Sequence, residues 1–384
     1  MRVGHVMTAG TAAAAVLVAG AGAATAAERR PAGKGCGDQR AVQRVLDRLT
    51  RVHRIPGVAV RIDDPRCGTW TGASGVADLR DRRPMRAGER GRIASVTKTF
   101  TATVLLQLAG ERKVDLDAPV ERYLPGVVRA NGHDGRKISV RSLLRHTSGL
   151  PDHMEAFDDL EDFRWKHFEP AELVRMALAR PKPTTRWHYS TTNSVLAGMI
   201  VRRVTGSRVE DEVVRRIIRP LRLRDTYWPG DETWIRGPHP RGYLREEKNG
   251  AVRWRDVTEL NASAGGAGGA LVSGTADVSR FFGALLGGRL LPLRLLGEMK
   301  RTVRADPDRT WPGARYGLGL MSTPLRCGGE WYGHGGHLYG WSAFGVVGPD
   351  GRRAAVMFNE NTATEAAAKD ELELLQTALC GEES

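Results

Sequence analysis

The chain has 384 residues, a formal net charge of +14 and 41% hydrophobic residues. This length and composition predict a globular protein with a large buried core and exclude a disordered or fibrous chain. The basic residues are spread out, with no basic run of five or more, no zinc-site spacing and no aromatic-plus-basic RNA motif, so a nucleic-acid partner is not expected. We expect an anionic cell-wall polymer as a partner, with genome composition as the alternative source of the arginine excess.

The N-terminus is predicted to be a secretory signal peptide over residues 1–27. Arg2 and His5 precede a small, apolar run at residues 9–24, and the Ala-Thr-Ala of residues 24–26 fits a cleavage site. A membrane anchor is the alternative, but the run is shorter than the roughly 20 apolar residues of a spanning helix. We therefore expect a secreted, extracellular protein with no membrane attachment after cleavage.

Four cysteines in an exported chain indicate disulfide bonds. Cys36 precedes the first helical pattern and Cys67 lies in a turn between two strand patterns, while Cys327 and Cys380 both fall in the C-terminal third. The preferred pairing is Cys36–Cys67 and Cys327–Cys380. Free buried thiols are the alternative.

The first predicted elements are a helix, a hairpin and a second helix. Apolar residues recur at helical spacing over 38–53, which predicts an amphipathic helix. Alternation predicts a strand at 57–62 that returns at 69–76. A second helix is predicted to open at Ser95 and to end near Gly110, and its scarcity of charge predicts burial.

The middle of the chain has a different pattern of predicted secondary structure from the segments on either side of it. Residues 111–261 contain helical patterns interrupted by proline and little strand alternation. Predicted helices at 275–286 and 363–379 then enclose four strand-like segments, at 316–321, 330–332, 341–347 and 353–358. This order predicts an α/β (α+β) fold in which residues 36–110 and 262–384 build one antiparallel sheet flanked by helices. The predicted helical insert is residues 111–261, with the active site at the junction.

Ser95 is the candidate nucleophile because Lys98 follows one helical turn later on the same face. A lysine amine kept neutral by desolvation can take the proton of a serine hydroxyl. The Ser-x-x-Lys pattern is weak by itself, and a simple helix cap at Ser95 is the alternative interpretation.

Three further segments carry chemistry. They are LLRHTSGLP at residues 143–151, WHYSTTN at 187–193 and GHGGH at 333–337. With the Ser-x-x-Lys pair and the glycine-rich segment at 268–281, they resemble the penicillin-recognising serine hydrolases: class C β-lactamases, secreted D-alanyl-D-alanine carboxypeptidases and related esterases. The YGLGL segment at 316–320, read as a strand, the histidine of GHGGH and cysteines like Cys327 and Cys380 resemble the secreted actinomycete-type carboxypeptidases most.

The resemblance implies a role for each residue of the constellation. Ser95 would attack a carbonyl and form an acyl-enzyme, while Lys98 and Tyr189 share the proton transfer. His334 would supply a donor or a partial positive charge beside Tyr189. The backbone N–H groups of Ser95 and His337 would form the oxyanion hole. Which group accepts the proton from Ser95 stays open.

Each of these residues also has a structural interpretation. Lys98 alone could be a surface lysine, Tyr189 a core aromatic with a bonded hydroxyl, and His334 part of a glycine bulge. We expect His146 to be structural, with its imidazole tying down a loop.

The substrate-binding residues depart from the family pattern. Thr191 stands where the family has an asparagine, and Asn193 follows two residues later. Gly335 and His337 occupy the places of two hydroxyls that hold a substrate carboxylate, and Met321 occupies the place of an arginine. A pocket tryptophan is replaced by Ala264. The residues expected to contact substrate are Thr191, Asn193, Gly335 and Gly336.

The expected function is that of an exported serine acyl-hydrolase acting like a D-alanyl-D-alanine carboxypeptidase on peptidoglycan-type peptides. One alternative is an esterase or amidase of the same family with another small ester or amide substrate. A second is a penicillin-binding or cell-wall-binding protein without turnover. No metal or organic cofactor is implied, because the chain lacks an H-E-x-x-H motif and its histidines are scattered.

Overall fold

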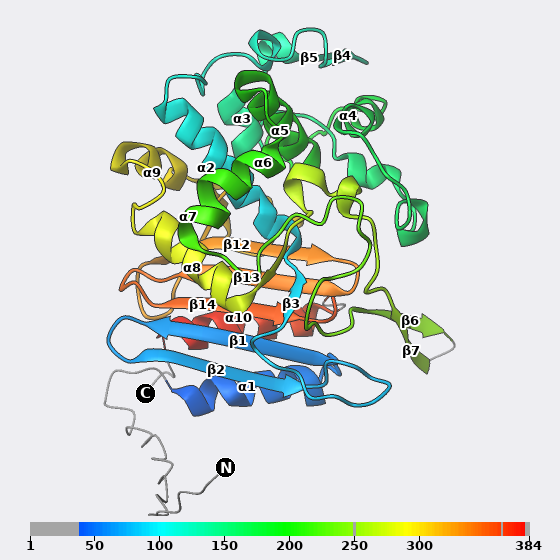
Figure 1. The fold of residues 1–384 in the computed structure, drawn as a ribbon, viewed down its shortest axis with the longest axis vertical. Coiled ribbons are helices and arrows are strands. Elements are labelled where there is room, and N and C mark those ends of the chain that lie inside the picture. Colours follow the sequence, from blue (N-terminus) through cyan, green and yellow to red (C-terminus); the bar gives the residue numbers. More distant parts are fainter. Residues whose placement is uncertain (1–37, 249–250, 362–363, 381–384) are drawn as a thin grey trace, which may run out of the picture. The chain divides into compact units, whose positions relative to one another are not determined.

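The computed structural model describes residues 38–248, 251–361 and 364–380. The predicted signal peptide lies outside these residues. The described part of the chain contains an eight-stranded antiparallel sheet with the strand order β2-β1-β14-β13-β12-β11-β10-β9 (Figure 1). Its strands are β1 (Gly57–Asp64), β2 (Gly68–Gly75), β9 (Val303–Arg304), β10 (Arg315–Tyr316), β11 (Met321–Pro324), β12 (Glu330–Leu338), β13 (Trp341–Val347) and β14 (Arg353–Phe358). The two ends of the chain meet where β1 pairs with β14, from Val58 opposite Phe358 to Asp63 opposite Arg353, which confirms the predicted sheet.

Helices cover both faces of this sheet. On one face lie α1 (Gln39–Arg51) and α10 (Glu365–Cys380), and on the other lie α2 (Thr97–Gly110) and α8 (Thr275–Leu286) (Figure 1). Side chains of successive residues in β14 pack on opposite faces of the sheet. Val356 packs in the cluster with α1 and α10, whereas Met357 packs in the cluster with α2 and α8.

The two N-terminal helices start in different ways. Asp38 caps α1, because its side chain accepts hydrogen bonds from the backbone N–H groups of Arg40 and Ala41. The predicted helix at Ser95 begins instead with a 3-10 turn, Ala94–Val96, before the regular helix. Ser95 therefore sits in the turn that leads into α2.

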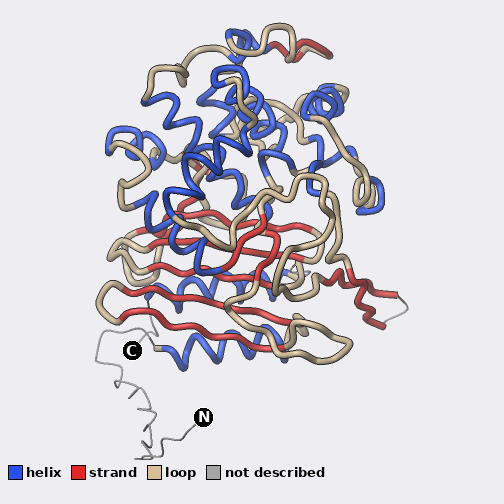
Figure 2. Tube along the Cα trace, in the orientation of Figure 1, coloured by secondary structure: helices blue, strands red, loops and turns tan. Residues whose placement is uncertain are grey.

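Helices joined by long loops are the main regular structure of the described residues between 111 and 261 (Figure 2). Its α-helices are α3 (Val140–Arg145), α4 (Pro170–Leu178), α5 (Thr191–Thr205), α6 (Val209–Val213) and α7 (Arg219–Leu221). Two small hairpins were missed by the sequence analysis: β4 (Arg129–Ala130) with β5 (His133–Asp134), and β6 (Tyr243–Lys248) with β7 (Ala251–Asp256). Its boundaries as a separate insert stay a prediction.

Glycines explain two corrections to the predicted strands. Residues 316–321 do not form one strand, because the chain turns between β10 and β11 and Gly319 adopts a left-handed conformation with φ of +71°. The predicted strand at 330–332 is longer, because β12 continues to Leu338 and includes the GHGGH segment, which was expected to lie before a strand. Its glycines let neighbouring backbone approach β12 closely.

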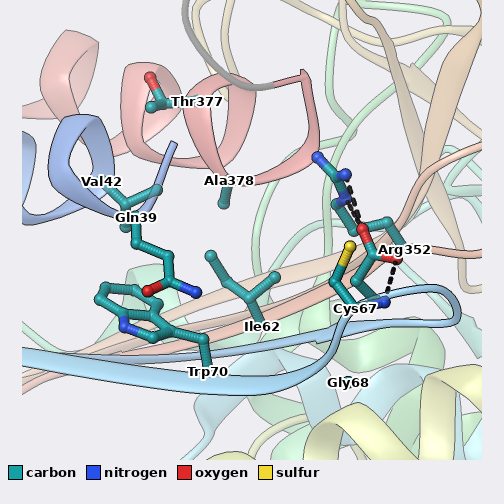
Figure 3. Close-up of a pocket in the computed structure, with 10 residues that line it drawn as sticks. Gln39, Val42, Ile62, Cys67, Gly68, Trp70, Arg352, Thr377 and Ala378 are labelled. Atoms are coloured by element: carbon teal, nitrogen blue, oxygen red, sulfur yellow. Dashed lines mark hydrogen bonds and ion pairs between the residues drawn. The ribbon is translucent and has the colours of Figure 1, made fainter. Parts of the chain in front are cut away.

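The disulfide between Cys327 and Cys380 is confirmed. The other predicted pair, Cys36–Cys67, involves Cys36, which lies outside the described residues. A small pocket borders Cys67 between α1, α10 and the strands β1 and β2, where Arg352 forms a buried ion pair with Asp64 (Figure 3). This pocket lies on the face of the sheet that α1 and α10 cover. No helix of the described residues is long and apolar enough to cross a membrane.

Three further elements belong to the described fold. They are β3 (Arg90–Arg92), which pairs with β8 (Val272–Gly274), and α9 (Leu293–Lys300).

Candidate active site

Ser95 lies on a sharp connection between β3 and α2. Ala94 has a φ of +45°, a left-handed conformation that is unfavourable for a residue with a side chain. Such backbone strain persists where the surrounding structure enforces it, and it concentrates at functional sites. The turn leaves Ser95 partly exposed, while Ala94 and Val96 on either side are buried.

Lys98 reaches the nucleophile. Its Nζ donates to the Ser95 Oγ at 2.9 Å and to the Gly268 carbonyl at 2.9 Å, and it lies 3.5 Å from the Thr191 Oγ1. The side chain is only 3% exposed. Burial lowers the pKa of Lys98 to about 8, against the opposing effect of Asp152. A useful fraction of the amine is therefore neutral near neutral pH, as proton abstraction from Ser95 requires.

Two glycines permit this close assembly. A Cβ on Gly268 would lie 2.8 Å from Thr191 Cγ2 and 3.3 Å from Lys98 Nζ. A Cβ on Gly336 would lie 2.3 Å from the Ile93 carbonyl oxygen and 2.8 Å from the Ser95 backbone nitrogen. Strand β12 therefore lies directly against the turn that carries the nucleophile.

Tyr189 covers Lys98 on the other side. The Lys98 Nζ lies 4.8 Å from the centre of the Tyr189 ring, and the Ser95 side chain acts on the Tyr189 hydroxyl. Burial raises the pKa of Tyr189 above its ordinary value, and the effect of the Ser95 side chain only partly opposes that rise. The phenol is thus protonated at neutral pH and is suited to pass a proton rather than to act as the first base.

His334 contacts a tyrosine that the sequence analysis missed. Its Nε2 lies 2.8 Å from the hydroxyl of Tyr316, and its Nδ1 bonds the Gly335 carbonyl. Burial, helped by the charge of Lys98, lowers the pKa of His334 to about 3, so the ring is neutral at neutral pH. The neutral ring carries no full positive charge, and the predicted role of His334 as a donor or partial positive charge beside Tyr189 stays a prediction. Tyr316 stands at the start of the YGLGL segment and packs edge-on to Tyr189.

His146 ties loops together, as its structural interpretation predicts. Its Nδ1 accepts from the Ser190 backbone N–H and from the Asn193 amide, at 3.2 Å and 3.0 Å. Its ring stacks on Tyr189 with ring centres 4.4 Å apart. The imidazole therefore fixes both the ring of Tyr189 and the start of α5.

Asp152 is an acidic neighbour of the site that the sequence analysis also missed. Its carboxylate accepts from the Thr191 hydroxyl at 3.3 Å, and its charge acts on Lys98. Asp152 follows Pro151, directly after the LLRHTSGLP segment, which is the signal that could have identified it. Asp152 is 8% exposed.

A pocket opens at Ser95. Four predicted site residues line it, Ser95, Lys98, Thr191 and His337, together with apolar residues that include Met154, Phe163, Leu260 and Leu338. The described lining contains no arginine. The oxyanion hole at the backbone N–H groups of Ser95 and His337 stays a prediction.

Several predicted substrate residues have other neighbours. Asn193 is buried and bonds His146 and Ser148, and Gly335 packs against Phe344. Met321, at the place of the family's arginine, is buried and pairs with Gly333 across β11 and β12. Their roles toward a substrate stay predictions. Among the described residues, no group of three or more His, Cys, Asp or Glu is placed to hold a metal ion.

Known proteins are similar to this chain in sequence and in fold. Residues 42–379 match the family described as Beta-lactamase. A D-stereospecific amidohydrolase from Streptomyces sp. has a similar structure, with a TM-score of 0.81, 40% identity and coverage of 90% of this chain and 100% of that one.

Two further relatives come from other bacteria. The esterase EstB of Burkholderia gladioli is 28% identical over 73% of this chain and 78% of its own length. A D-aminopeptidase of Cereibacter sphaeroides is 28% identical over 89% of this chain, and the match spans 63% of that relative. The family match covers the sheet, the nucleophile turn, Lys98, Tyr189 and β12, so the chain belongs to the Beta-lactamase family of serine hydrolases.

Proposed function

We propose that this serine hydrolase cleaves amides or esters of D-amino acids that carry a free α-amino group, through a Ser95 acyl-enzyme. A similar solved structure is a D-stereospecific amidohydrolase, and a D-aminopeptidase matches most of the chain. The proposed preference for D-amino acids rests on the names of these two similar proteins. The proposed free α-amino group of the substrate rests on the charges around the pocket.

The observation that carries the proposal is the position of Asp152. Its carboxylate bonds Thr191, which lines the pocket, at 3.3 Å. Met321 and Gly335 provide no cation or hydroxyl for a substrate carboxylate, whereas Asp152 places a negative charge beside the pocket. A carboxylate favours an ammonium group and repels another carboxylate.

The contacts support one sequence of proton transfers. The neutral Lys98 Nζ takes the Ser95 hydroxyl proton, and the Oγ attacks the substrate carbonyl carbon. As the tetrahedral intermediate collapses, the scissile bond breaks and the leaving amine or alcohol takes a proton delivered from Lys98 by way of Tyr189. Water then cleaves the acyl-enzyme ester and releases the acid and Ser95. Burial of Tyr189 favours Lys98 as the first base.

The test compares matched substrates on the wild type and on Asp152→Asn. We expect hydrolysis of D-phenylalanine or D-alanine amide to exceed that of the L-amides, and Ser95→Ala to abolish it. Asp152→Asn should raise KM for the free-amine amides at least tenfold and leave KM for an N-acetylated ester of the same acid within about twofold. An equal change in KM for both substrates would show that Asp152 does not bind the substrate's free amine.

The carboxypeptidase function remains a second candidate because His337 lines the pocket with a side chain that is 40% exposed. It requires release of D-alanine from a peptide ending in D-Ala-D-Ala. A penicillin-binding protein without turnover would instead form a stable Ser95 adduct with a β-lactam and hydrolyse none of these substrates. Export and contact with the cell wall are part of the same proposal, and mass spectrometry of protein from the culture medium tests export.

A further inference from the structure

A second group of charged side chains lies away from the pocket at Ser95, around the C-terminal end of α3 and α9. A solvent-open hollow of about 460 Å³ is formed there. Its lining residues are Asp117, Arg141, Arg145, Glu298, Arg301 and Thr302. Three arginines and two carboxylates face one another, so their pairing decides what the hollow can bind.

Two of the arginines use both carboxylates. Arg141 holds Asp117 through its Nε and one terminal nitrogen, at 2.6 Å and 2.9 Å, and holds Glu298 through the other nitrogen at 2.8 Å. Arg301 bonds the second oxygen of Glu298 at 2.8 Å. No carboxylate of the hollow remains for Arg145.

Arg145 is left without a counter-ion. Its Nε is buried and has no hydrogen-bond partner, and no ion pair joins the side chain to any described residue within 4.0 Å. Burial lowers the pKa of Arg145, as does the charge of Arg141, while Glu298 and Asp117 act in the opposite direction. A guanidinium stays charged at neutral pH, and a partly buried charge without a partner is unfavourable.

We propose that this hollow binds a phosphate group, with Arg145 as its principal donor. A guanidinium presents N–H donors in a planar fork that matches two oxygens of a phosphate. Arg301, whose side chain is 74% exposed, supplies further donors at the rim. The Thr302 hydroxyl accepts from Arg315 at 2.9 Å and keeps its own hydrogen to donate. Three arginines against two carboxylates leave one positive charge for the ligand.

The hollow is connected to the candidate active site by two residues that are adjacent in sequence. Arg145 is the last residue of α3, and the next residue, His146, stacks on Tyr189. A bound phosphate therefore stabilises the helix end that carries this histidine, since a ligand that binds only the folded state adds to its stability. Inorganic phosphate and the phosphodiester of an anionic polymer share the chemistry that the hollow recognises.

The experiment is calorimetric titration of the full chain with inorganic phosphate at constant ionic strength, set by chloride. Wild type is expected to bind one phosphate with a millimolar Kd and to gain Tm as phosphate rises. Arg145→Gln should weaken binding at least tenfold. Arg294→Gln, the matched control, removes the same charge from an exposed position on α9 outside the hollow and should leave Kd within twofold.

Equal binding by wild type and Arg145→Gln, or equal losses in Arg145→Gln and Arg294→Gln, would overturn the site. If Arg145→Gln does not fold, Arg301→Gln serves in its place and should weaken binding at least threefold; an unchanged Kd there also counts against the hollow. Titration with glycerol phosphate polymer distinguishes the sources. Tighter binding per phosphate than the free ion, lost in the same variants, identifies the polymer, and weaker binding identifies free phosphate.

Discussion

At the scale of single residues, the site rests on how burial acts on three neighbouring side chains. Lys98 loses hydration and becomes easier to deprotonate, whereas Tyr189 loses hydration and becomes harder to deprotonate. The same burial keeps His334 neutral. The residue types alone allowed either the Lys98 amine or the Tyr189 phenol to be the base. Burial distinguishes them, because it lowers the pKa of Lys98 and raises the pKa of Tyr189.

This separation predicts a pH profile. Lys98 acts as a base only when neutral, so kcat/KM for an ester substrate should rise about tenfold per pH unit below about 8 and level off above it. Steady-state rates between pH 5.5 and 10 measure the inflection. Tyr189→Phe should lower the rate but keep the inflection in place. An inflection that disappears in that variant would assign the base to Tyr189.

At the scale of elements, the decisive contact is β12 against the turn at Ser95. Glycine at position 336 places the strand so close that a Cβ would collide with backbone atoms of Ile93 and Ser95, which cannot rotate away. The family resemblance already placed the GHGGH motif near Ser95, but only the structure shows that Gly336 itself lies against backbone atoms of Ile93 and Ser95. The strand-like segments at 341–347 and 353–358, by contrast, were predicted with the observed limits of β13 and β14.

Gly336→Ala is therefore expected to damage both stability and catalysis. Overpacking of this kind costs about 1–3 kcal/mol of unfolding free energy, and displacement of β12 should lower kcat/KM by more than tenfold. Urea unfolding and ester kinetics measure the two effects. Gly297→Ala is the matched control, because a Cβ there meets no atom within 4 Å and should be neutral or slightly stabilising. An active, fully stable Gly336→Ala variant would contradict the close contact.

At the scale of the whole molecule, the sheet joins the two ends of the chain, and the disulfide fixes α10 to it. Cys327 lies between β11 and β12, and Cys380 ends α10. Both sulfurs sit outside the pocket lining at Ser95. We therefore expect the disulfide to stabilise the fold and to take no part in catalysis.

Removing the disulfide should lower stability with little effect on turnover. Closing a loop between residues 53 apart in sequence corresponds to about 4 kcal/mol in the chain-entropy treatment. The double variant Cys327→Ser with Cys380→Ser should lose a comparable unfolding free energy and several degrees of Tm, measured by calorimetry. Its kcat per labelled active site should stay within twofold of wild type. A large loss of kcat with unchanged stability would show that the crosslink shapes the site.

The sequence by itself predicted the sheet built from both ends, the Ser95–Lys98 pair and, as the preferred pairing, the Cys327–Cys380 bond, because periodicity, a one-turn spacing and the number and positions of the cysteines can be read along the chain. Only the tertiary structure decided which distant groups surround that pair. Asp152 beside Thr191, Tyr316 on His334 and the Gly268 carbonyl on Lys98 all come from separate segments. Hydrogen bonds between such segments, and the burial that shifts their pKa values, arise from packing and leave no periodic trace in the chain.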